Sequence, residues 1–245
     1  MKNKIKVVAL AIMLCAGSLA YGQQEQKFAQ AQKQNAQALR QYTWKSRSQV
    51  RKDGDVKSTK IFLTRYASDG TQVQVLLEED SARLPKFGLR GMIARKKKEE
   101  AAQLIEALQK LAKSYGELPP AKMQEFRGRA TATLETNAPQ PLLRLEASDV
   151  LQPNDSMTVW VDANTRRQRR IEINSSYDAK AVRIVSEFKD LPSGPTYMAR
   201  SVVDYPHEEL TLTVENFDHQ HDAQSLRGKQ DSNENATGTY VRQKQ

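Results

Sequence analysis

Cysteine is nearly absent from the sequence, and long apolar runs are missing as well. The one cysteine, Cys15, lies near the N-terminus, so residues 16–245 can form no disulfide bond and offer no thiol for catalysis or metal binding. Leu14 precedes Cys15 where the lipobox of a lipid-anchored protein has a small residue, which disfavours lipidation. A membrane-spanning helix needs about 20 consecutive apolar residues, and the longest stretch, within residues 7–20, is shorter. We therefore expect a soluble chain that packing stabilises.

Sequence motifs of common catalytic sites are also missing. The chain contains no Gly-x-Ser-x-Gly elbow, no His-Glu-x-x-His helix and no glycine-rich phosphate loop. Its adjacent carboxylates, such as Glu78 with Glu79 and Glu208 with Glu209, fall at the ends of expected strands, where charged residues are ordinary. We expect no catalytic residue, no enzymatic activity and no cofactor. The open alternative is a hydrolase of envelope polymers whose catalytic carboxylates no motif reveals.

The first residues have the three-part layout of a secretory signal peptide. The first three lysines precede the apolar residues 7–14, and small residues then lead to a polar stretch that opens at Gln23. We predict that residues 1–22 are a signal peptide, cleaved after Ala20 or Gly22. The rest of the chain is then expected in the periplasm.

Two kinds of period follow along the chain. Residues 23–41 contain no glycine or proline and place apolar residues at helical spacing, which predicts an N-terminal helix, with a flexible leader as the alternative. Alternation of apolar and polar residues then predicts strands over 42–51, 56–66 and 71–79. Tight turn signals join these three strands, so we expect an antiparallel meander.

A helical insert interrupts the strands. Residues 93–115 carry apolar side chains on one face, Gly116 suits the helix end, and Pro119-Pro120 suits the start of a second helix to about residue 126. Alternation returns over six later segments, at 142–148, 157–162, 167–174, 181–188, 196–205 and 210–217. We predict one α+β domain over 23–217, mainly antiparallel β, with helices on one side of the sheet.

The C-terminal segment is polar. Residues 218–245 have too few apolar side chains to offset the entropy of ordering them, which predicts a disordered tail. Its first residues, Asp218, His219, His221 and Asp222, are of types that bind divalent metals. Because no rigid shell is visible to orient the rings, we expect no specific metal site.

One hairpin resembles a known family. Residues 159–165, Val-Trp-Val-Asp-Ala-Asn-Thr, followed by Arg-Arg-Ile-Glu-Ile at 169–173, are similar to the strand, Asp-x-x-Thr turn and strand of the LolA superfamily of outer-membrane lipoprotein-sorting carriers. The order of helix, strands, helical insert and strands is similar as well. The chain departs from that pattern at 166–168, where Arg-Arg-Gln replaces Gly-Leu-Pro, and in its C-terminal tail.

The resemblance implies an unclosed, strongly curved β-barrel with a helical lid, and it implies a monomeric periplasmic carrier of a lipidated or apolar ligand, such as lipoprotein acyl chains, involved in lipoprotein sorting. The alternative is a helix packed permanently on a filled core, in a non-catalytic envelope interaction or sensor module. The candidate ligand-binding residues are Trp44, Phe62, Tyr66, Leu104, Ile105, Leu108, Leu111, Trp160, Ile171 and Ile184.

Basic residues outnumber acidic ones. The formal net charge is +9, and +6 without the three lysines of the signal peptide. Such a charge suits nucleic acid, anionic lipid or an acidic protein, and export makes nucleic acid the least suitable, so we expect none. Candidates for contact with an anionic membrane surface or an envelope protein, with a solvated charge run as the alternative, are Arg95, Lys96, Lys97 and Lys98 and, in the hairpin, Arg166, Arg167, Arg169 and Arg170.

Overall fold

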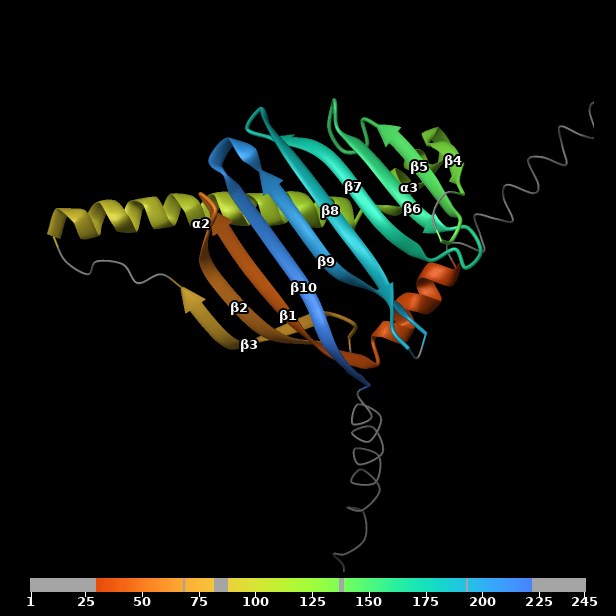
Figure 1. Ribbon diagram of the computed structural model, residues 1–245, viewed down its shortest axis with the longest axis horizontal. Coiled ribbons are helices and arrows are strands. Elements are labelled where there is room, and N and C mark those ends of the chain that lie inside the picture. The colour runs from red at the N-terminus through yellow and green to blue at the C-terminus, as the bar shows by residue number, and fades with distance from the viewer. Residues whose placement is uncertain (1–29, 68, 82–87, 137–138, 193, 222–245) are drawn as a thin grey trace, which may run out of the picture.

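A computed structural model describes residues 30–67, 69–81, 88–136, 139–192 and 194–221. The expected signal peptide and residues 222–245 lie outside the described residues. All strands belong to one ten-stranded sheet in the order β3-β2-β1-β10-β9-β8-β7-β6-β5-β4 (Figure 1). Every neighbouring pair is antiparallel, and β3 and β4 lie at opposite edges. The predicted mainly antiparallel, unclosed α+β fold is confirmed.

The strands are β1 (Tyr42–Lys52), β2 (Asp55–Tyr66), β3 (Gln72–Ser81), β4 (Thr131–Glu135), β5 (Leu142–Ser148), β6 (Ser156–Asp162), β7 (Gln168–Tyr177), β8 (Lys180–Asp190), β9 (Thr196–Tyr205) and β10 (Leu210–His221). A 3-10 turn (Pro206–Glu208) joins the last two. Strands that follow one another in the chain are neighbours in the sheet, except β3 and β4, which lie at its two edges; in addition, the first strand, β1, pairs with the last, β10.

Helices connect the two edges of the sheet. The insert after the third strand consists of α2 (Gly88–Gly116) and α3 (Pro120–Arg129), so the first helix begins five residues earlier than predicted. Because β3 and β4 are the two edge strands, this connection has to cross the whole sheet, and Figure 1 shows α2 running along one face. No helix among the described residues is long and apolar enough to cross a membrane. The N-terminal helix is described over residues 30–39.

Two strand predictions were wrong at particular residues. Strand β4 was not predicted, because four of its five residues are exposed and show no alternation in burial. Strand β10 continues to His221, whereas we expected the tail to open at Asp218. The alternation is hidden there by an irregular register opposite Thr43 and Lys45, with Asp218 at a left-handed φ of 54°.

The hydrophobic core lies under α2. Leu108 and Tyr115 of α2 and Phe126 of α3 are almost fully buried. Along the strands, side chains two residues apart share a face, and the core takes Met157, Val159 and Val161 of β6, Ile173 of β7, Val182 and Ile184 of β8, Val203 and Tyr205 of β9, and Leu210 and Leu212 of β10. This face, called the inner face below, is therefore filled by side chains beneath the C-terminal half of α2.

A buried carboxylate anchors the end of α2. The Tyr115 hydroxyl donates a hydrogen bond to Asp155 at 2.5 Å, and the amides of Val150, Leu151 and Gln152 donate to the same carboxylate at 2.6 to 2.9 Å. Burial alone would raise the pKa of Asp155, but these hydrogen bonds outweigh it and hold the pKa below its ordinary value. The helix is thus tied to the β5–β6 loop by a group that stays ionised.

Candidate functional site

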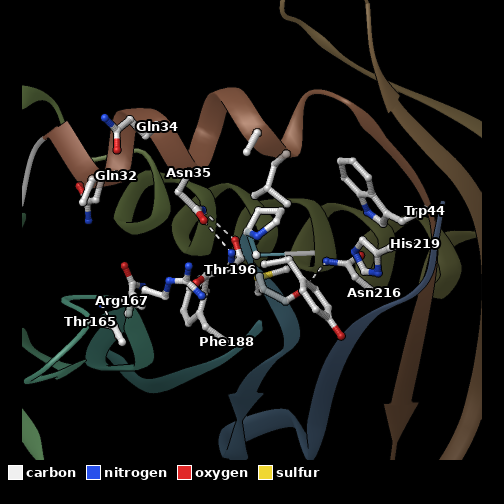
Figure 2. A pocket seen from close by; sticks show the side chains of 18 of the residues that line it. Gln32, Gln34, Asn35, Trp44, Thr165, Arg167, Phe188, Thr196, Asn216 and His219 are labelled. Atoms are coloured by element: carbon white, nitrogen blue, oxygen red, sulfur yellow. Dashed lines mark hydrogen bonds between the residues drawn. The ribbon is translucent and has the colours of Figure 1, made fainter. Parts of the chain in front are cut away.

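A cavity of about 730 Å³ opens on the inner face, away from the core. The N-terminal helix covers it, and the ends of β1, β9 and β10 together with the β6–β7 turn form its walls (Figure 2). It is lined by Ala31, Gln32, Gln34, Asn35, Ala38, Leu39, Trp44, Tyr66, Gln72, Thr165, Arg166, Arg167, Gln168, Phe188, Gly194, Pro195, Thr196, Tyr197, Met198, Asn216 and His219.

Aromatic rings form one end of the cavity. Trp44 is 8% exposed, and the His219 ring stacks nearly parallel to it, 5.9 Å between centroids and 14° between planes. Tyr197 lies 4.0 Å from His219, and Tyr66 lies 5.6 Å from Trp44, again between centroids. Burial lowers the pKa of His219, so its imidazole is neutral at pH 7.

The register irregularity in β10 explains how His219 reaches the cavity. Asn216 faces inward and Phe217 outward, so regular alternation would place Asp218 inward. The extra residue of β10 opposite Thr43 and Lys45 reverses the alternation, and His219 faces inward instead. Asp218 pairs with Lys45 at 2.8 Å on the outer side.

Hydroxyl groups separate the cavity from the core. Along β1 the inner-face residues run from Trp44 in the cavity through Ser46 and Ser48 to Val50, which packs on the core. Ser46 hydrogen-bonds Thr64 at 3.1 Å and donates to Asn216 at 2.6 Å.

Neighbouring strands repeat the pattern. Ser186 of β8 and Ser201 of β9 share a hydrogen bond at 2.9 Å, and they lie between core residues and the cavity residues Phe188 and Met198. The inner face therefore has two compartments, divided by a belt of hydroxyls.

Arginines form the other end of the cavity. The Asp162 carboxylate accepts hydrogen bonds from the amides of Asn164 and Thr165 at 3.0 and 2.9 Å, which fixes the β6–β7 turn. Arg166 follows at a left-handed φ of 60° and is exposed at the cavity rim. Arg167 points toward the cavity beside Thr165 in Figure 2 and pairs with Asp190 at 3.3 Å.

Asn35 fastens the N-terminal helix over the cavity. Its side-chain amide donates to the backbone carbonyl of Thr196 at 2.8 Å and accepts from the Thr196 amide at 2.6 Å, the two dashed bonds at the centre of Figure 2. The Thr196 hydroxyl donates to Asp190 at 2.5 Å, and Arg169 joins Asp190 to Asp162. A continuous polar network thus runs from the helix to the β6–β7 turn.

The structure divides the predicted ligand-binding residues into three groups. Trp44 and Tyr66 line the cavity. Leu108 and Ile184 are core residues, and Leu104, Ile105, Leu111 and Ile171 are partly buried against that core. Trp160 lies on the opposite face, between the inward Val159 and Val161, with Arg170 at 5.5 Å over its ring. Phe62 is half-buried on β2 and does not line the cavity.

Sequence reasoning missed Asn35, Tyr197, Asn216 and His219 as cavity residues. Asn35 lies within the N-terminal helix that the sequence predicts, and an amide side chain between apolar positions of that helix was the available signal. His219 carried no signal, because its position depends on the register irregularity in β10.

The basic candidates differ in their surroundings. Lys96 and Lys97 are exposed on α2, with Lys96 at 4.0 Å from Glu100, while the side chains of Arg95 and Lys98 lie outside the described residues. In the hairpin, Arg167 and Arg169 pair with Asp190 and Arg170 pairs with Glu172 at 2.8 Å. Contact with a membrane or a partner stays a prediction.

The histidines of the expected tail have separate neighbours. His219 contacts Trp44 and Tyr197, whereas His221 contacts the Tyr42 ring at 5.1 Å. Within the described part of the chain, no group of three or more His, Cys, Asp or Glu side chains gathers that could hold a metal ion.

No protein-family model matches the chain, and no curated protein sequence does. Three solved structures are similar in the arrangement of the chain. A DUF1329 family protein from Desulfovibrio piger is 10% identical, with a TM-score of 0.42 over 82% of this chain and 93% of that one. A domain described as an outer membrane lipoprotein-sorting protein, from Vibrio parahaemolyticus, is 10% identical, with a TM-score of 0.41 over 84% and 96%.

The third structure, a LolA superfamily protein from Nitrosomonas europaea, is 11% identical, with a TM-score of 0.33 over 76% of this chain and 90% of that one. With such identities and TM-scores below 0.5, the similarity concerns the arrangement of the elements alone.

Proposed function

We propose that the protein is a non-catalytic periplasmic carrier that binds a lipidated or apolar ligand in the cavity beneath its N-terminal helix. The cavity of about 730 Å³ carries this proposal. Ligand sites in proteins are commonly about 300–1,000 Å³, with mostly apolar and aromatic walls and a few polar groups. Here Trp44, Tyr66, Tyr197 and Met198 supply apolar surface, and amide and guanidinium groups supply the polar positions. Lipoprotein sorting is the form of this function that the family resemblance implies.

The cover in this proposal is the N-terminal helix, not α2. The side chains of α2 pack into a filled core, so moving α2 would expose that core to water. The N-terminal helix instead faces the cavity with Ala31, Asn35 and Ala38, and two hydrogen bonds from Asn35 fasten it. Releasing the N-terminal helix therefore costs far less free energy than moving α2, and a ligand can enter when the N-terminal helix moves.

The two tryptophans of the chain allow a direct test, since Trp44 lines the cavity and Trp160 lies on the opposite face. In the W160F variant the remaining tryptophan is Trp44, so its fluorescence reports on the cavity. The W44F variant keeps Trp160 instead and is the matched control. We expect dodecanoate and dodecanol, each added below its micelle-forming concentration, to shift the emission of W160F and leave W44F unchanged.

Native mass spectrometry of the protein purified from its host envelope should show a bound lipid mass. If neither probe changes the W160F emission and the mass is that of the bare chain, the carrier function is wrong.

Exposed lysines favour the second candidate function, an envelope interaction module. Lys96 and Lys97 are exposed on α2. Co-sedimentation with anionic vesicles, lost in a K96E/K97E variant and absent with uncharged vesicles, would support this function. If the protein binds neither vesicle type, this second function is wrong.

A further inference from the structure

The charge that lines the cavity is entirely positive. Arg166 and Arg167 are its charged side chains, and no carboxylate is among the described residues that line it. His219 adds no charge at neutral pH, because burial lowers its pKa. A cleft whose charged side chains are all of one sign raises the local concentration of counter-ions, which are anions here.

The carboxylates nearest to these arginines are already engaged. Asp162 accepts from two turn amides and pairs with Arg169 at 3.1 Å. Asp190 accepts from the Thr196 hydroxyl and pairs with Arg169 at 2.9 Å and with Arg167 at 3.3 Å. Arg167 and Arg169 therefore share these two carboxylates, and within the described residues Arg166 has no carboxylate at ion-pair distance. The Arg166 guanidinium is therefore left to bind an anion that does not belong to the chain.

The turn that carries Arg166 is held in a fixed shape. Its amide donates to the Asp162 carbonyl at 2.9 Å, and the Asp162 amide donates to the Arg167 carbonyl at 2.8 Å. The backbone that carries this cation is therefore fixed before binding, and a guanidinium can hold a carboxylate or phosphate through two parallel hydrogen bonds.

The opposite end of the cavity suits an apolar group. Figure 2 shows Trp44 and His219 on one side of the view and Thr165 and Arg167 on the other, with Asn35 and Thr196 between them. Because one end of the cavity is cationic and the other is aromatic, we propose that the ligand is an anionic amphiphile. Its carboxylate or phosphate lies at Arg166 and Arg167, and its apolar body lies against Trp44, Tyr66 and Tyr197. This proposal rests on the proposed function.

Four twelve-carbon probes that differ only in their head group test this proposal in the W160F background. They are dodecanoate, dodecyl phosphate, dodecanol and dodecyltrimethylammonium, the last because aromatic rings also bind quaternary ammonium groups. We expect at least one anionic probe to bind about tenfold or more tightly than dodecanol, as charge-assisted hydrogen bonds allow. The advantage should shrink at high salt. The tighter of the two anions identifies the carboxylate or the phosphate as the natural head group.

The variant R166N removes the free cation at small backbone cost, because asparagine tolerates a left-handed φ. We expect it to bring the anionic probes within about threefold of dodecanol, whose own affinity stays unchanged. The matched control is R144N, on the face that Trp160 occupies, where Arg144 pairs with Glu146. It should leave every affinity unchanged.

The outcomes separate the two proposals. Equal binding of dodecanol and the anions, tighter binding of the ammonium probe, or an anion preference that R166N leaves intact overturns the anionic ligand while the carrier function stands. Binding of none of the four probes overturns both.

Discussion

The inner face of the sheet has two compartments that differ in what covers them. Beneath α2, long aliphatic side chains such as Leu104 and Leu108 meet Ile173 and Ile184, and the space is filled. Beneath the N-terminal helix, the cavity is lined by Ala31, Gln32, Gln34, Asn35, Ala38 and Leu39, and the space stays open. The same strands run through both compartments, so the helix that covers each part decides whether the space above the sheet is filled or open.

The two helices also differ in the hydrogen bonds that hold them on the sheet. Helix α2 is tied by Tyr115, whose hydroxyl donates to the buried, ionised Asp155, and three amides of the β5–β6 loop hold that carboxylate in place. The N-terminal helix is tied by the neutral Asn35, with two hydrogen bonds to one residue. The comparison predicts that substitutions under α2 affect folding, whereas substitutions under the N-terminal helix affect binding.

The largest effect should come from the filled compartment. L108A removes a fully buried side chain and leaves a void, so we expect the free energy of unfolding to fall by about 2–5 kcal/mol. Urea denaturation measures this loss. A loss below about 1 kcal/mol would mean that α2 is only loosely packed and would make the two compartments alike.

Replacing the α2 anchor should cost somewhat less. D155N keeps the shape but loses the charge that four donors stabilise, and we expect a loss of about 2–3 kcal/mol near neutral pH.

The pH dependence has a definite sign. Because the folded pKa of Asp155 lies below its ordinary value, its stabilisation is complete above about pH 3.9 and is lost as the pH falls below that value. Urea denaturation of the parent protein and of D155N between pH 7 and pH 3 should show their free energies of unfolding converging in acid. Parallel curves would rule out an ionised anchor.

Releasing the N-terminal helix should have a smaller effect on folding. N35A removes two hydrogen bonds and leaves the Thr196 amide unpaired, so we expect a loss of about 1–2 kcal/mol. Stopped-flow fluorescence of Trp44 should show faster entry and exit of dodecanoate. Unchanged rates would mean that the ligand does not pass beneath this helix.

Filling the open compartment should change stability least and binding most. A38L places a large side chain toward the cavity, whereas A36L places the same side chain on the exposed side of the helix. We expect both variants to unfold within about 1.5 kcal/mol of the parent, and only A38L to lose dodecanoate binding. Equal binding by the two variants would place the ligand elsewhere.

Much of this arrangement could be predicted from local pattern. Alternation predicted nine of the strands and helical spacing predicted α2, because most of these elements bury one face. Strand β4 was not predicted, because it does not bury one face: Leu134, its one large apolar residue, is 58% exposed. The same patterns predicted the helical insert after the third strand, and the family resemblance implied the unclosed sheet, which is confirmed.

The site was harder to predict, for a physical reason. Period two shows which strand side chains share a face, but Trp44 and Tyr66 line the cavity whereas Ile184, on the same face, lies in the core. Whether a face is filled depends on which helix docks on each part of it. The spacing of Ala31, Asn35 and Ala38 indicates a helix without indicating where it lies.

The pairing of β1 with β10 has a consequence for how the chain reaches its native state. Tyr42 lies opposite His221, so β1 and β10, which are neighbours inside the sheet, come from opposite ends of the described chain. Such distant partners give a high contact order, which slows folding. Synthesis proceeds from the N-terminus, and until β10 is complete β1 has an unpaired edge and Trp44 lacks its His219 neighbour. The cavity is therefore among the last features to form, and an unfinished chain lacks it.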